Sequence, residues 1–148
     1  MRLITIILMM AFVKCFGQQS VPLDAADWIG AKINVLMKDY TDTAVLPAND
    51  GIIIFSKKKL QSEEVKKLWV FIAAGAAGKY FNDHPCSTNY VLYFSDVGDM
   101  KARPIRTLAL NLSVAKSVQS RIYNEKLGLK EGISEIWNSL EPKTMEMP

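Results

Sequence analysis

Cysteine and histidine are scarce in this chain of 148 residues, which holds two cysteines and one histidine. Cys15 falls in an N-terminal hydrophobic segment that we expect to be removed, so Cys86 is the only thiol expected in the mature protein. A single cysteine cannot form a disulfide within its own chain. The fold must therefore rely on its apolar core, and a chain of this length can bury a sizeable one.

Sequence motifs of catalysis or cofactor binding are also missing. The chain contains no G-x-S-x-G, no H-E-x-x-H and no dinucleotide-binding fingerprint, and it shows no internal repeat. After the N-terminal segment, its most apolar stretch is Leu68–Gly78, which is too short to cross a bilayer. With 49% apolar and 22% charged residues, the composition is that of an ordinary globular protein. We therefore expect one domain and no cofactor.

An excess of charge of one sign is absent as well. The formal net charge is +3, but two of the 18 basic residues, Arg2 and Lys14, lie in the segment that we expect to be removed. The remaining 16 basic residues face 15 acidic ones, which leaves a net charge of +1. The charge balance thus gives no reason to expect nucleic acid or an anionic membrane surface as a partner.

Residues 1–17 have the pattern of a signal peptide. Met1 and Arg2 form a short basic start, Leu3–Val13 is apolar, and small residues follow at Cys15 and Gly17. This arrangement predicts cleavage after Gly17 and export of a protein that begins at Gln18. We therefore expect a periplasmic or secreted protein with no membrane span after cleavage, and the lack of a disulfide favours the periplasm.

Two other outcomes for this segment remain open. A lipid could be attached at Cys15, as in bacterial lipoproteins, although Lys14 occupies the position where a small residue is preferred. The segment could also stay uncleaved as an anchor.

The expected core lies between Gly51 and Asp96. The segments 51–56 and 90–95 are apolar and rich in strand-forming residues, and Ser62–Phe81 between them has a helical pattern. Three consecutive isoleucines leave the first strand no polar face, which predicts a strand that is covered on both sides. We expect a buried, mutually packed cluster of Ile53, Phe55, Trp69, Ile72, Leu92 and Phe94.

The remaining segments complete an α+β sandwich in the order α-β-β-α-β-β-α-α, with an antiparallel or mixed sheet covered by helices. A helix is expected at Asp24–Tyr40 and a strand at 43–46, which a Pro-Ala-Asn-Asp-Gly turn joins to the next strand. Residues 105–112 favour a strand over an early helix start. Helices are expected at 113–127, ended by Gly128, and at 130–140, anchored by Trp137. The domain spans 18–142, and 143–148 form a flexible tail.

His84 and Cys86 flank Pro85 and bring an imidazole and a thiol close together in the sequence. A cysteine nucleophile needs a base, usually a histidine, and a third group that orients the base, a role that Asp83 could fill. However, two side chains on either side of a proline rarely point at each other, and no known cysteine-enzyme motif surrounds them. The triad of Cys86, His84 and Asp83 is therefore a weak catalytic hypothesis beside an ordinary loop histidine and a structural cysteine.

Lys57, Lys58 and Lys59 form the strongest cluster of like charge. They follow a central strand and precede a helix, which is where α/β folds often bind anions. Glu63 and Glu64 already occupy that helix start, and the loop contains no glycine that could shape a phosphate cradle. We keep the three lysines as a weak anion-binding patch, against the simpler interpretation of a solvated surface.

Metal binding has little support. One histidine and one mature cysteine cannot supply a standard zinc site without carboxylates. Asp96 and Asp99 do not follow the spacing of a calcium loop. We therefore expect no metal.

These observations favour a non-enzymatic domain of the cell envelope that binds a protein or a small ligand. One alternative is a small cysteine-dependent hydrolase or transferase that uses Cys86 and His84. Another is an inhibitor or immunity-type partner of a secreted enzyme. The identity of the ligand and the oligomeric state do not follow from the sequence.

Overall fold

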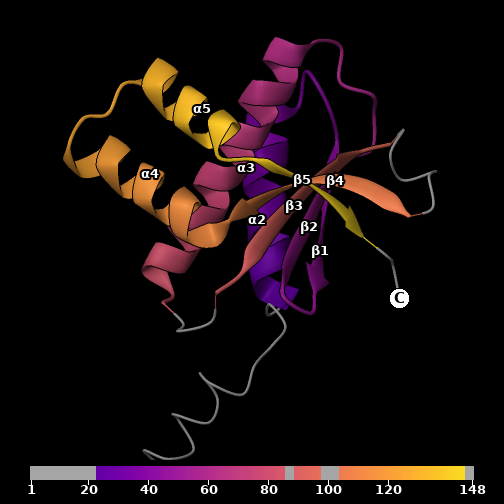
Figure 1. Ribbon diagram of the computed structural model, residues 1–148, viewed down its shortest axis with the longest axis horizontal. Coiled ribbons are helices and arrows are strands. Elements are labelled where there is room, and N and C mark those ends of the chain that lie inside the picture. Colours follow the sequence, from indigo (N-terminus) through magenta and orange to yellow (C-terminus); the bar gives the residue numbers. More distant parts are fainter. Residues whose placement is uncertain (1–22, 86–88, 98–103, 146–148) are drawn as a thin grey trace, which may run out of the picture.

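The computed structural model describes residues 23–85, 89–97 and 104–145, which form a single small α+β domain. The elements follow one another as helix α2 (Leu23–Met37), strands β1 (Thr43–Ala48) and β2 (Gly51–Ser56), helix α3 (Glu63–Asp83), and strands β3 (Val91–Asp96) and β4 (Ile105–Asn111). Helices α4 (Leu112–Asn124) and α5 (Leu129–Asn138) and strand β5 (Glu141–Met145) complete the domain (Figure 1). The expected signal peptide, with Cys15, lies outside the described residues.

The five strands form one mixed sheet in the order β1-β2-β3-β4-β5. Only β2 and β3 are parallel, because α3 connects them as a crossover, and the other neighbours are antiparallel. Ala48 pairs with Gly51, so the expected β1–β2 hairpin turns through Asn49 and Asp50. The second expected strand pair is also confirmed, because 105–111 form a strand that pairs with β3.

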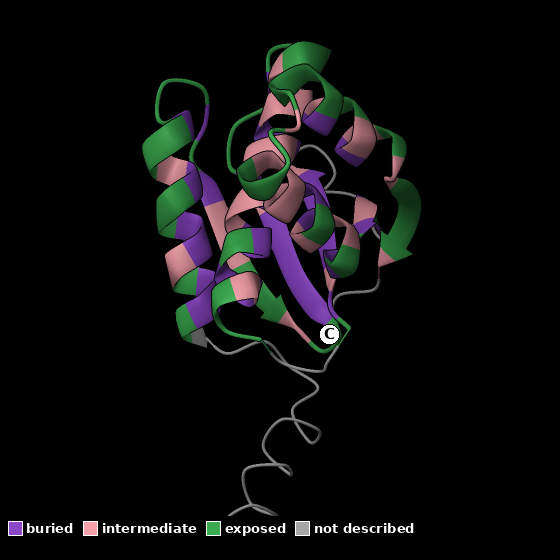
Figure 2. Cartoon of the chain, turned by 90° about the vertical axis from the view of Figure 1, so that its left-hand side faces the viewer, coloured by how far each residue is buried: buried purple, intermediate pink, exposed green. Residues whose placement is uncertain are grey.

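The described helices lie together on one face of the sheet (Figures 1 and 2). This face presents Ile52, Ile54, Leu92, Phe94 and Leu110, which are buried against the helices. Trp69 of α3 is fully buried, its ring meets Phe94 edge to face at 5.8 Å between centroids, and its Nε1 donates to the Thr43 hydroxyl at 3.0 Å. The expected packing of Trp69, Leu92 and Phe94 in one core is therefore confirmed.

For Ile53, Phe55 and Ile72, the expected buried and mutually packed cluster is confirmed only in part. Side chains alternate along a strand, so Ile53 and Phe55 lie on the face of β2 opposite Ile52 and Ile54. Ile53 is still buried there, whereas Phe55 is only partly buried, and neither belongs to the core beneath the helices. Ile72 is partly buried and packs at the margin of the core. The helices of the described residues therefore cover one face of the sheet.

Several element boundaries also differ from expectation. The first helix ends at Met37 rather than Tyr40, and α4 ends at Asn124, before Gly128. Gly128 instead precedes α5 as its N-terminal cap residue. The region expected to be a flexible tail begins as strand β5, which pairs with β4 from Ala109–Glu141 to Ile105–Met145.

The last helix, α5, packs on α3 and α4, as its amphipathic pattern predicted. Its buried anchor is Ile136, however, while Trp137 is partly buried at the margin, where the ammonium of Lys67 lies 5.3 Å from its ring centroid. An ion pair between Arg121 and Glu135 joins α4 to α5. None of the helices in the described residues is long and apolar enough to cross a membrane.

Candidate functional site

The structure places His84 at the C-terminal end of α3, where it caps the helix. Its backbone N–H donates to the Tyr80 carbonyl oxygen at 2.9 Å, and its ring Nδ1 lies 3.0 Å from the same oxygen. The imidazole stacks on the Tyr80 ring, with centroids 4.4 Å apart. These contacts give His84 a structural role at the helix end.

In the described residues, Asp83 pairs with a lysine of α3 rather than with the His84 imidazole. The Asp83 carboxylate pairs with the Lys79 ammonium at 2.9 Å, one helical turn earlier. Cys86 lies outside the described residues, so its use as a nucleophile stays a prediction from the sequence.

The three lysines after β2, Lys57, Lys58 and Lys59, are all exposed. Lys57 pairs with Asp42 at 3.3 Å, and both side chains are about half exposed, so this ion pair is weak. Ser62 caps α3 by accepting a hydrogen bond from the Val65 N–H at 3.2 Å, with Glu63 and Glu64 in the first turn. The Ser62 hydroxyl already accepts one N–H of this helix start, and two acids add negative charge to its first turn. Both features disfavour anion binding at this position.

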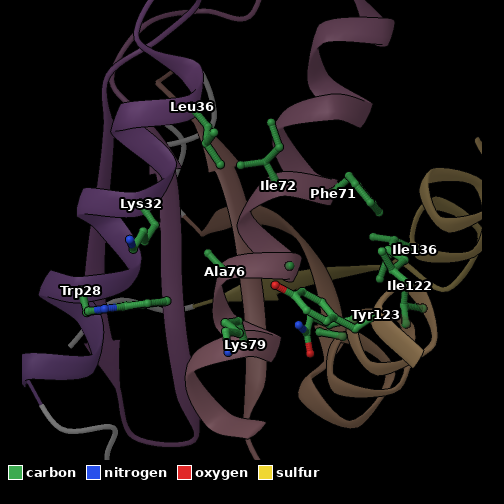
Figure 3. A pocket seen from close by; sticks show the side chains of 14 residues that line it. Trp28, Lys32, Leu36, Phe71, Ile72, Ala76, Lys79, Ile122, Tyr123 and Ile136 are labelled. Atoms are coloured by element: carbon green, nitrogen blue, oxygen red, sulfur yellow. The ribbon is translucent and has the colours of Figure 1, made fainter. Parts of the chain in front are cut away.

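A groove lies on the helical side of the domain. It has a volume of about 410 Å³ and runs over the outer surface of α3, with α2 on one side and α4 on the other (Figure 3). Its lining is mainly aliphatic and aromatic, and includes Leu36, Phe71, Ile72, Val118, Ile122 and Ile136. Pockets of this size and character are those that take small molecules.

The floor of the groove contains Gly75 and Ala76. A Cβ atom added to Gly75 would meet no other atom within 4 Å, so the chain itself does not require glycine there. Gly78, one turn later, differs: its added Cβ would lie 2.7 Å from the carbonyl oxygen of Ala115. Gly78 therefore permits the close approach of α3 and α4, while Gly75 leaves open space above the helix.

Two aromatic side chains, each with a lysine, flank this floor (Figure 3). Trp28 comes from α2, with the Lys32 ammonium 5.3 Å from its ring centroid, and Tyr123 comes from α4, with the Lys79 ammonium 6.0 Å from its centroid. The hydrogen bond and charge of Asp83 raise the pKa of Lys79 above its usual value, so this ammonium stays protonated at neutral pH.

Sequence reasoning missed this groove. The buried stripe of α2 includes Ile29, Ile33 and Met37, whereas Leu36 is 63% exposed. Leu36 and Phe71 are apolar residues beside the buried stripes of their helices. Surplus apolar residues of this kind are the one signal that could have indicated a second apolar surface.

A polar cluster lies on the sheet face that the helices leave uncovered. The Tyr93 hydroxyl donates to Asp50 Oδ2 at 2.5 Å and accepts from Lys143 Nζ at 3.3 Å. Burial, and then the hydrogen bond and charge of Asp50, raise the pKa of Tyr93 well above its ordinary value. The phenol thus stays protonated at physiological pH and can donate its hydrogen bond to Asp50, and the bond from Lys143 joins β5 to the centre of the sheet.

The described residues contain no group of three or more histidine, cysteine or acidic side chains that could hold a metal ion. Comparisons with protein-family models, with curated proteins and with solved structures found no match to this chain. Any functional argument therefore rests on the geometry of the described residues.

Proposed function

We propose that the protein is a non-enzymatic binding domain and that its ligand is a small, largely apolar molecule held in the groove between α2, α3 and α4. The observation that carries this proposal is the unfilled space above Gly75, in the middle of a helix and between two aromatic walls. Glycine inside a helix costs about 0.8–1 kcal/mol relative to alanine. No contact among the described residues accounts for that cost at Gly75, whereas a ligand lying on the helix would use the space.

The exposed apolar side chains around the groove also favour an apolar ligand. Leu36 is 63% exposed and Tyr123 is 76% exposed, and both line the groove. A ligand that covers them removes apolar surface from water, and each buried methylene contributes about 0.8 kcal/mol. The volume suits a small molecule, and this favours a ligand of that kind over a protein partner.

The test compares binding of the neutral, apolar fluorophore N-phenylnaphthylamine by the wild-type chain and by a variant with a filled groove. Gly75→Leu places an aliphatic side chain in the open space, and Ser134→Leu adds the same side chain at an exposed position of α5 that does not line the groove. We expect Gly75→Leu to bind the dye about tenfold more weakly, which corresponds to about 1.4 kcal/mol.

The control variant Ser134→Leu should bind like wild type, and both variants should keep the wild-type unfolding midpoint or exceed it. Equal dye affinity in all three proteins, with Gly75→Leu folded, would refute the groove as the binding site.

A further inference from the structure

The charges around the groove are all of one sign. Among the described residues that line it, the charged side chains are Lys32 of α2 and Lys79 of α3, and no acid is present. The Lys79 ammonium forms an ion pair with the Asp83 carboxylate, with 2.9 Å between Nζ and Oδ2. Lys32 takes part in none of the ion pairs found among the described residues. The groove therefore offers an uncompensated cation beside an apolar surface.

The groove has an aliphatic end at Leu36 and Ile72, and Lys79 lies toward its other end. Figure 3 shows Trp28 and Lys79 toward one end and Leu36 and Ile72 toward the other, with Lys32 between them on the α2 side. The residue spacing within α2 agrees with this order along the groove, because Trp28, Lys32 and Leu36 follow one another at intervals of about one helical turn. A ligand that suits this arrangement has an anionic head and an apolar body.

On the basis of the function proposed above, we propose that the ligand is a free single-chain amphiphile with a carboxylate head, of the fatty-acid type. The carboxylate pairs with Lys32, and the hydrocarbon chain crosses Gly75 and Ala76 on the floor of the groove. A cationic amphiphile would place like charges together, and a neutral one would leave Lys32 without an ionic partner. A monomeric chain fits a groove of about 410 Å³, whereas a bilayer surface needs no such concavity.

The experiment compares three ligands that share one alkyl chain: decanoate, 1-decanol and decylammonium. Each is titrated below its micellar concentration into the 15N-labelled full chain, and amide shifts of α2, α3 and α4 report binding. An exposed ion pair contributes about 0.2–1 kcal/mol, so decanoate should bind roughly two- to fivefold more tightly than decanol. Decylammonium should bind more weakly than decanol, and the preference for decanoate should shrink as salt screens the exposed charges.

The matched variants are Lys32→Met and Lys38→Met. Lys32 belongs to α2, whereas Lys38 directly follows the last residue of α2 and does not line the groove. We expect Lys32→Met to lower decanoate affinity roughly two- to fivefold and to leave decanol affinity unchanged. Lys38→Met should behave like wild type with both ligands.

The outcomes separate this inference from the function on which it rests. If decanol binds as tightly as decanoate, or if decylammonium binds most tightly, the proposal of a carboxylate head is refuted. The proposal of an apolar binding groove is then unaffected. If anionic phosphatidylglycerol vesicles capture the protein but monomeric decanoate causes no amide shifts, the proposal of a free amphiphile is refuted. A membrane surface would then be the favoured partner. If none of the three ligands shifts the groove residues, the proposed function itself fails.

Discussion

Two glycines of α3, one turn apart, should respond in opposite directions to the same substitution. Gly75 lies under the open groove, and Gly78 lies against the backbone of α4. Replacing glycine by alanine inside a helix gains about 0.8–1 kcal/mol when the methyl group has room. The sign of each effect therefore depends on what the new Cβ meets.

At Gly75 the added methyl group meets no atom within 4 Å, so Gly75→Ala should raise the free energy of unfolding by about 0.5–1 kcal/mol. At Gly78 the methyl group would lie 2.7 Å from the oxygen and 3.0 Å from the carbonyl carbon of Ala115. These are backbone atoms, so the two helices would have to separate. Overpacking of this kind costs about 1–3 kcal/mol, which exceeds the gain in helix propensity. We expect Gly78→Ala to lower stability by up to about 2 kcal/mol.

Urea denaturation followed by circular dichroism measures both changes, and unchanged slopes would show that the unfolding transition itself is the same. Two results would refute the reasoning. Equal stabilisation by the two substitutions would show that α3 and α4 do not approach each other at Gly78. Destabilisation by Gly75→Ala would show that protein atoms already fill the space assigned to a ligand.

Two further predictions concern the core and export. Leu92→Ala should lower the free energy of unfolding by about 2–5 kcal/mol, because Leu92 is fully buried beneath the helices, and an unchanged urea midpoint would contradict the assigned sheet face. We also propose that the chain is exported and cleaved after Gly17, so the intact mass of the exported protein should begin at Gln18. A mass that retains residues 1–17, or a diacylglycerol adduct at Cys15, would contradict this proposal.

Local signals in the sequence predicted much of the fold. The turn residues between Ala48 and Gly51 indicated the β1–β2 hairpin, and Ser62 followed by two acids indicated the start of α3. Periodicity was less informative in 52–54, because three isoleucines fit either face of the strand. Which of them faces the helices depends on the pairing register of β2 and β3, a long-range contact that local pattern does not encode.

Strand β5 escaped prediction because its sequence, Glu-Pro-Lys-Thr-Met, has no apolar alternation. It is held by pairing with β4, by the Thr107 hydroxyl donating to the Lys143 carbonyl oxygen at 2.8 Å, and by the bond from Lys143 to Tyr93. Pro142 is tolerated because β5 has only one neighbour in the sheet and lies at its edge.

The candidate site was harder to predict from the sequence than the fold was. Trp28, Gly75 and Tyr123 come from three different helices, and only packing brings them to one groove. The residue types that first suggested chemistry, His84 and Asp83, are engaged at the end of α3 with Tyr80 and Lys79.

The central claim is that a small apolar ligand binds on the outer surface of α3. Isotope-filtered nuclear Overhauser spectroscopy of N-phenylnaphthylamine bound to the 13C-labelled chain tests this claim most directly. Cross-peaks should connect the dye to the methyl groups of Ile72, Ala76 and Ile122, which line the groove. Cross-peaks to Ile53, on the sheet face opposite the helices, without any to these three residues, would contradict it.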